Sequence, residues 1–151
     1  MIVVDASVLT NALTDDGSVG ASSRAELARD AHWAAPAHIV VEVFSAIRGR
    51  WLGQKISQTR AEDALSAMVS TTIDLVGAAP LLNRMWELRS NVSGYDAAYL
   101  AVAETFDCAL VTADARLARI PDLRCEVRLA LPLSRGPDGS SDPGSGSASG
   151  K

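Results

Sequence analysis

Short apolar runs alternate with longer segments of helical periodicity over residues 1–129. The short runs are rich in Val, Ile, Leu and Ala, which favours buried strands, whereas the longer segments repeat apolar residues every three or four positions, which favours helices. We expect strands at 1–4, 33–35, 72–76, 109–111 and 125–129, and helices at 6–14, 20–30, 37–54, 57–70, 80–89, 93–106 and 115–119. This alternation predicts an α/β fold with a central parallel sheet flanked by helices on both faces.

The segment 37–54 carries an apolar stripe at the spacing of one helix face, formed by Val40, Val43 with Phe44, Ile47 and Trp51. Such a stripe packs into the core in most globular proteins. If it is exposed, it would instead suit an amphipathic segment of a partner protein. The sequence leaves both interpretations open.

The composition changes at residue 134, after which the chain consists mainly of Gly, Ser, Pro and Asp. A segment with so few apolar residues cannot bury a core. We therefore expect one domain at 1–133 and a disordered tail at 134–151.

The composition of the 151 residues, 48% hydrophobic and 21% charged, is that of an ordinary globular domain. The longest apolar runs, such as 39–41, are far shorter than the ~20 residues of a membrane-spanning helix. Residues 1–5 lack the basic start and the small-residue cleavage site of a signal peptide. These features predict a cytoplasmic location.

The net charge of −4 does not exclude a nucleic-acid partner. Residues 1–133 contain 16 acids and 12 bases, so four acids gathered around a metal would leave the rest of the domain neutral. Twelve of the 14 basic residues are arginine, whose forked guanidinium suits phosphate groups.

Neither cysteine nor histidine spacing indicates a zinc site. Cys108 and Cys125 lie in apolar runs and are expected to be buried free thiols. His32 and His38 do not form a His-Glu-x-x-His pattern. A metal would therefore be held by oxygen ligands, which favours Mg²⁺ or Mn²⁺.

Three aspartates occupy the places where a parallel sheet binds ligands. Asp5 and Asp114 each follow an expected strand, and Asp96 lies at the start of an expected helix. Ligands of open parallel sheets bind beyond the carboxyl ends of the strands. Glu42 lies between Val41 and Val43 in an apolar helix, where a charge usually has a partner or a function.

Each acid also has a purely structural interpretation. An aspartate between a strand and a helix is often an N-cap, which fits Asp5 and Asp114. Ser93 and Asp96 have the spacing of a capping box, and Glu42 could lie on a solvated stripe. The four acids together nevertheless match the chemistry of phosphodiester hydrolysis, in which Mg²⁺ neutralises developing negative charge and activates water.

The chain resembles the PIN-domain ribonucleases, and in particular the VapC-like toxins of VapBC-type toxin–antitoxin pairs. The resemblance covers nearly all of residues 1–133 and rests on four segments in order: Val3-Val4-Asp5-Ala6-Ser7, Val41-Glu42-Val43, Tyr95-Asp96-Ala97-Ala98-Tyr99-Leu100-Ala101 and Thr112-Ala113-Asp114-Ala115-Arg116-Leu117. It implies a Rossmann-like sheet, a Mg²⁺ or Mn²⁺ cofactor, RNA cleavage, a homodimer and a VapB-like antitoxin.

The resemblance also implies roles for particular residues. Asp5, Glu42, Asp96 and Asp114 would be catalytic, and the three aspartates would bind the metal. Ser7 and Thr112 match positions that support the metal site by hydrogen bonding, although both could simply cap helices. Arg116 and Arg119 could contact RNA phosphates or lie on a solvated helix face.

Two other functions are also compatible with parts of the sequence. One is an acid-pocket phosphoryl-transfer protein, but a haloacid-type phosphatase would have an aspartate in place of Ser7. A receiver domain would have a late lysine, whereas the only lysine before the tail is Lys55. The other is a non-catalytic RNA-binding PIN module, which would be expected to lack one of the acids.

Overall fold

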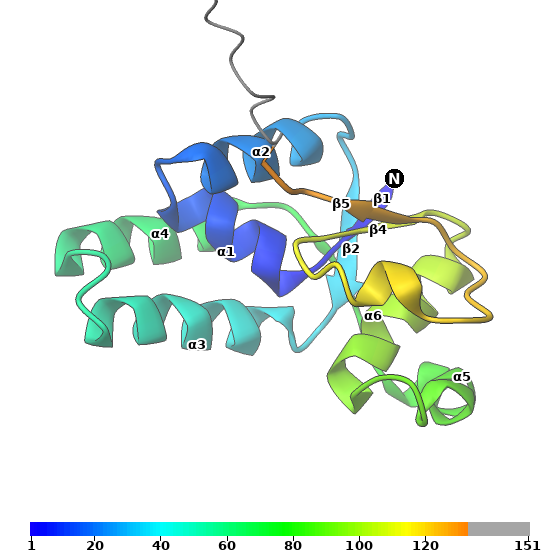
Figure 1. Ribbon diagram of the computed structural model, residues 1–151. Coiled ribbons are helices and arrows are strands. Elements are labelled where there is room, and N and C mark those ends of the chain that lie inside the picture. Colours follow the sequence, from blue (N-terminus) through cyan, green and yellow to red (C-terminus); the bar gives the residue numbers. More distant parts are fainter. Residues whose placement is uncertain (133–151) are drawn as a thin grey trace, which may run out of the picture.

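A computed structural model describes residues 1–132 and has a five-stranded sheet at its centre (Figure 1). All adjacent strands are parallel and their order is β3-β2-β1-β4-β5. The strands are β1 (Ile2–Val4), β2 (Trp33–Pro36), β3 (Asp74–Val76), β4 (Ala109–Thr112) and β5 (Val127–Leu129). The predicted α/β class and parallel sheet are confirmed.

Helices cover both faces of the sheet, with α1 to α4 on one side and α5 and α6 on the other (Figure 1). The α-helices are α1 (Ala6–Thr14), α2 (Ser18–Leu27), α3 (Ile39–Leu52), α4 (Gln58–Ser70), α5 (Leu82–Leu88) and α6 (Gly94–Thr105), and the 3-10 helices are η1 (Ala79–Leu81) and η2 (Leu117–Arg119). In residues 1–132, no helix is long and apolar enough to cross a membrane. The predicted tail at 134–151 lies outside the described residues.

The direction of the strand order changes at β1. From β1 the chain continues to β2 and β3 on one side, and later returns to β4 and β5 on the other. Val4 pairs with Val111, so β1 and β4 end at nearly the same level. This is the topological switch point of the sheet, where open α/β folds bind ligands beyond the strand ends.

The core is centred on β1, β4 and α6. All three residues of β1 are fully buried, as expected for a central parallel strand with helices on both faces. Seven successive residues of α6, from Ala97 to Ala103, are also buried. Four of the seven are alanines, whose small side chains let this helix pack close to the sheet, so its first turn is held at the switch point.

Several predicted boundaries differ from the observed ones. Pro36 is the last residue of β2 rather than the residue that stops it. The predicted helix 80–89 begins as η1 before α5, and the predicted helix 115–119 is the 3-10 helix η2. Cys108 and Cys125 are free thiols as expected, but only partly buried.

The prediction that the apolar residues of 37–54 form one helix face was wrong, because on α3 they lie on two rows. Ile39, Val43 and Ile47 form the buried row, whereas Phe44 and Trp51 are 51% and 42% exposed. Val40 also faces outward. The helix is apolar on two adjacent rows, and the helices packed against it, α1 and α4, bury only one of them.

An ion pair anchors α6 to α5. Arg84 donates through Nε and Nη2 to Glu104 at 2.6 and 2.9 Å, and Glu104 also accepts the backbone N–H of Arg124 at 3.0 Å. Burial alone would raise the pKa of Glu104. The hydrogen bonds from Arg84 and Arg124 outweigh burial and hold that pKa below its ordinary value.

We expect Glu104→Gln to lower the free energy of unfolding by about 1–3 kcal/mol at neutral pH, because hydrogen bonds to a charged group are weakened. The pKa of Glu104 is lower in the folded than in the unfolded state. Its stabilisation is therefore complete above the unfolded value near 4.5 and is lost as the pH falls through the folded value. Urea unfolding of both proteins across this range should show their difference shrinking in acid, and a constant difference would contradict the assignment.

Candidate active site

Asp5 lies directly beyond β1, at the switch point of the sheet. Its backbone N–H donates to the carbonyl of Val111 at 3.0 Å, and its side chain is buried. Oδ2 of Asp5 accepts two hydroxyl hydrogen bonds, from Ser7 at 2.5 Å and from Thr112 at 2.6 Å. One carboxylate oxygen thus accepts hydrogen bonds from two hydroxyl groups, one close to Asp5 in sequence and the other 107 residues away.

The two hydroxyl groups have their own partners, which determine the direction of each hydrogen bond. Ser7 Oγ accepts the N–H of Ala113 at 3.1 Å, and Thr112 Oγ1 accepts the N–H of Asp114 at 3.0 Å. Each hydroxyl proton is therefore free to point at Asp5. Asp5 occupies the N-cap position of α1 but its side chain makes no capping bond there, so capping does not explain this carboxylate.

Asp96 lies in the first turn of α6, and its backbone N–H donates to Ser93 Oγ at 3.1 Å. Burial raises the pKa of Asp96, and the negative charges of Asp5 and Asp114 raise it further. Ser93 and Arg116 act in the opposite direction without cancelling the rise. Asp5 and Asp114 are therefore both near enough to Asp96 for their charges to affect it.

Asp114 is paired with Arg116 two residues later. The guanidinium donates through Nε to both carboxylate oxygens at 3.0 Å and through Nη2 to Oδ2 at 2.5 Å. The backbone N–H of Arg116 donates to Oδ1 at 2.9 Å. The side-chain bonds from Arg116 lower the pKa of Asp114, and the charge of Arg116 adds to the effect.

Glu42 is held by the Tyr99 hydroxyl and lies near the His38 ring, two neighbours that sequence reasoning missed. Tyr99 donates its hydroxyl to Oε2 of Glu42 at 2.6 Å, and His38 Nε2 lies 3.4 Å from the same oxygen. The His38 ring makes edge contacts with Tyr95 and Tyr99. Tyr99 is three residues after Asp96 on α6, so helical spacing was the available signal.

Tyr99 also connects Glu42 to the aspartates. Its side chain is buried, and burial raises its pKa far above the ordinary value. The hydrogen bond to Glu42 adds to this rise, and so does the charge of Asp5. Tyr99 therefore remains a neutral donor to Glu42 and is also affected by the charge of Asp5.

The oxygen-rich donor set fits a hard divalent cation. Carboxylates and waters are the usual ligands of Mg²⁺ and Mn²⁺. Within residues 1–132, no three side chains of His, Cys, Asp or Glu stand close enough together to hold a metal ion in their present positions. Asp114 is turned to Arg116, so a shared cation would replace the guanidinium as its partner.

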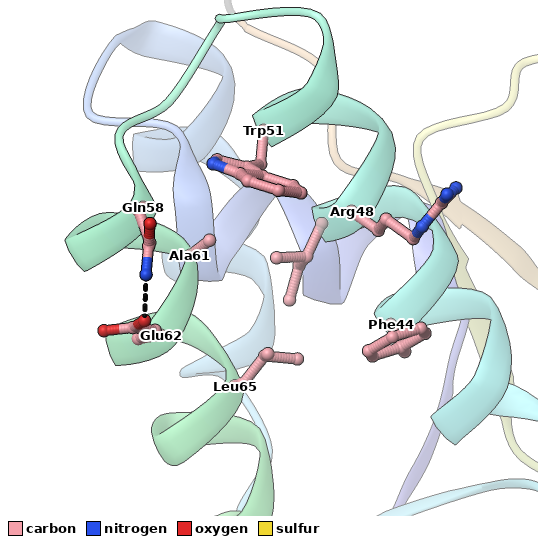
Figure 2. Close-up of a pocket in the computed structure, with 8 residues that line it drawn as sticks. Phe44, Arg48, Trp51, Gln58, Ala61, Glu62 and Leu65 are labelled. Carbon is pink, nitrogen blue, oxygen red and sulfur yellow. Dashed lines mark hydrogen bonds between the residues drawn. The ribbon is translucent and has the colours of Figure 1, made fainter.

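A second feature is an apolar groove between α3 and α4 (Figure 2). It has a volume of about 380 Å³ and lies away from the four acids. Phe44, Trp51 and Leu65 line it, and Arg48 and Glu62 lie at its rim (Figure 2). The outward row of the α3 stripe forms one of its walls.

The model of the family described as the PIN domain matches residues 2–123. The chain belongs to the PIN-domain family. It is 37% identical over 128 residues to ribonuclease VapC1 of Mycobacterium tuberculosis, covering 84% of this chain and 96% of that protein. It is 34% identical to ribonuclease VapC9 of the same species, with the same coverage of each.

A solved structure supports the PIN fold independently. The crystal structure of M. tuberculosis VapC20, described as a toxin that cleaves the sarcin–ricin loop, superimposes with a TM-score of 0.61. It covers 83% of this chain and 99% of VapC20, at 16% sequence identity. At that identity the likeness supports the fold alone. The resemblance proposed from the four sequence segments is confirmed.

The PIN fold places the predicted site residues as follows. Ser7 and Thr112 bind Asp5 directly, Asp96 is affected by the charges of Asp5 and Asp114, and Glu42 is bound by Tyr99. Arg116 is bound to Asp114, and Arg119 is exposed at the end of η2. The catalytic, metal-binding and RNA-binding roles assigned to these residues stay predictions.

Arg116 occupies the carboxylate of Asp114, so a metal that used this carboxylate would have to displace it. We expect Mg²⁺ to stabilise the wild type, by about 2.7 kcal/mol at a hundred times its dissociation constant. Arg116→Gln should lower the Mg²⁺ concentration of half-maximal stabilisation by roughly twofold to fivefold, the range for an exposed pair. Thermal melts titrated with Mg²⁺ at constant ionic strength measure this concentration.

Arg119→Gln is the matched control, because it removes the same charge nearby without touching Asp114. Asp96→Asn should lose the stabilisation by Mg²⁺. Equal shifts in the two arginine variants would show that general charge, not competition for Asp114, sets the metal affinity.

Proposed function

We propose that this PIN domain is an endoribonuclease that uses Mg²⁺ or Mn²⁺ to hydrolyse RNA phosphodiester bonds, and that it is the toxin of a type II toxin–antitoxin system. The observation that carries the proposal is the group of three aspartates at the switch point, with Asp5 held by Ser7 and Thr112. The names of the relatives VapC1 and VapC9, both ribonucleases, support the same activity.

Asp5, Asp96 and Asp114 would hold the metal. Bound there, Mg²⁺ or Mn²⁺ would neutralise negative charge on the phosphate and lower the pKa of a bound water. Ser7 and Thr112 hold the Asp5 carboxylate in one orientation by binding Oδ2. Neither residue would contact the phosphate, so both are positioning residues.

Glu42 would take up the proton of the attacking water. Its Oε2 is bound by the Tyr99 hydroxyl, which leaves Oε1 for that proton. The Tyr99 hydroxyl cannot take the proton itself, because it donates to Glu42 and its pKa is strongly raised. A non-catalytic PIN module would lack this complete set of acids.

We expect single-stranded RNA to be cleaved with Mg²⁺ or Mn²⁺ and to stay intact with excess EDTA. Asp5→Asn and Asp96→Asn should reduce the rate by more than about a hundredfold, and Ser7→Ala by about tenfold to a hundredfold, as for outer-shell partners of a metal. Asp63→Asn, an exposed aspartate on α4, is the matched control and should retain full activity.

The rates are measured on a fluorescent RNA with protein purified in parallel for every variant. Cleavage at the same rate in excess EDTA would contradict the proposal that the reaction needs a metal. Equal activity in the Asp5, Asp96 and Asp63 variants would trace the cleavage to a contaminating nuclease.

The α3–α4 groove would bind a VapB-like antitoxin through an amphipathic segment. The groove offers exposed apolar side chains with an arginine and a glutamate at its rim, which suits a helix with one apolar face and flanking charges. The names of the VapC relatives support a partner of this kind. We also expect a homodimer, as the family resemblance implies.

We expect the small protein encoded next to this gene to copurify with it and to inhibit RNA cleavage. Phe44→Ala and Trp51→Ala should each weaken the complex by about thirtyfold, the scale of an interface hot spot. Phe106→Ala is the control, because Phe106 is similarly exposed but lies at the end of α6. A neighbouring protein that neither binds nor inhibits would contradict the toxin assignment, and isothermal titration calorimetry measures the affinities.

A further inference from the structure

A polar cavity of about 550 Å³ opens beside Asp96. Its walls come from the loop between α5 and α6 and from the segment around η2, and they include Arg89, Asn91, Ser93 and Arg116. A volume of this size is typical of small-molecule sites. Because Asp96 belongs both to the cavity and to the aspartate group, a molecule in the cavity would lie next to the acids.

Two of the three charged side chains that line this cavity are arginines, and the third is Asp96. Arg89 and Arg116 line it and are both exposed. Arginine binds phosphate oxygens with two parallel hydrogen bonds. A nucleic-acid strand bound by these two arginines would lie beside the aspartates. The arginine charges would offset the repulsion between the carboxylates and the phosphates.

The guanidinium of Arg89 lies over an aromatic ring. Its guanidinium carbon lies 4.3 Å from the centre of the Trp86 ring, and Nη1 donates to the carbonyl of Trp86 at 2.6 Å. The indole itself is 68% exposed. A planar guanidinium on an indole is a surface on which an unpaired nucleobase can stack.

A second, apolar cavity of about 310 Å³ adjoins the polar one. The two share Arg89, Val92 and Ser93, and the apolar cavity adds Met85 and Trp86. A charged space therefore leads into an apolar space lined by an aromatic ring. A nucleotide has the same division, with a charged phosphate at one end and a flat base at the other.

We propose that the two adjoining cavities bind one nucleotide of a single-stranded RNA, next to the phosphate that is cleaved. Arg89 and Arg116 bind the phosphate, and the base stacks against the Trp86–Arg89 pair. A base in a duplex is already stacked on both faces, so only an unpaired base fits. This assignment rests on the proposed ribonuclease function and adds a binding determinant outside the four acids.

Binding of fluorescent RNA heptanucleotides of random sequence tests the proposal. Anisotropy is measured with the Asp5→Asn protein, in which the RNA stays intact. In this background, Trp86→Leu should weaken binding about fivefold to a hundredfold, the range for one lost base stack. Arg89→Gln should also lower the slope of log affinity against log salt concentration by about 0.7, the loss of one phosphate contact on a single strand.

Phe106→Ala and Arg29→Gln are the controls for the aromatic and the charge change, and neither should alter affinity or slope. Unchanged binding in Trp86→Leu and Arg89→Gln would overturn the subsite, while RNA cleavage by the wild type would still support the ribonuclease. If both variants bind weakly but the wild type cleaves no RNA, the proposed function fails and the nucleotide site stands. If light scattering shows that Trp86→Leu changes only the oligomeric state, the face is an interface between copies and the subsite is overturned.

Discussion

Two hydroxyl groups meet on one oxygen of Asp5, and the rest of the site depends on this junction. Ser7 comes from the first turn of α1 and Thr112 from the end of β4, 107 residues after Asp5. The same hydroxyls accept backbone N–H groups of the segment that leads to Asp114. The junction therefore holds the Asp5 carboxylate and the path of the next acidic segment at the same time.

Crowding of negative charge is the cost of this arrangement. The carboxylates of Asp5 and Asp114 both raise the pKa of Asp96, so the folded protein holds like charges close together. Arg116 relieves part of the repulsion by pairing with Asp114. Active sites commonly lower the free energy of unfolding in this way, and other parts of the fold must supply the stability.

Helix α6 links the crowded acids to the core of the protein. Its first turn carries Asp96, its buried middle carries Tyr99, and its last turn carries Glu104. The hydrogen bonds of Glu104 with Arg84 and Arg124 fix the far end of the helix. Because the helix is rigid and closely packed against the sheet, Asp96 cannot move away from the other acids to relieve the repulsion.

The sequence by itself determined the alternation of strands and helices, the parallel sheet and the four acids in their order. These features depend on local periodicity and on motif segments, which are readable without contacts. Ser57 is also of a residue type that favours the N-cap position, and in the structure its hydroxyl accepts the N–H of Arg60.

Only the tertiary structure decided which side chains meet. The bond from Thr112 to Asp5 depends on the register of β1 against β4, and the bond from Tyr99 to Glu42 depends on how α6 and α3 are placed. The pairing of Asp114 with Arg116 is local but depends on side-chain direction. The two apolar rows of α3 show the same limit. Periodicity reveals that a helix has apolar faces, but its packing partners, here α1 and α4, decide which face is buried. Burial is a property of neighbours distant in sequence.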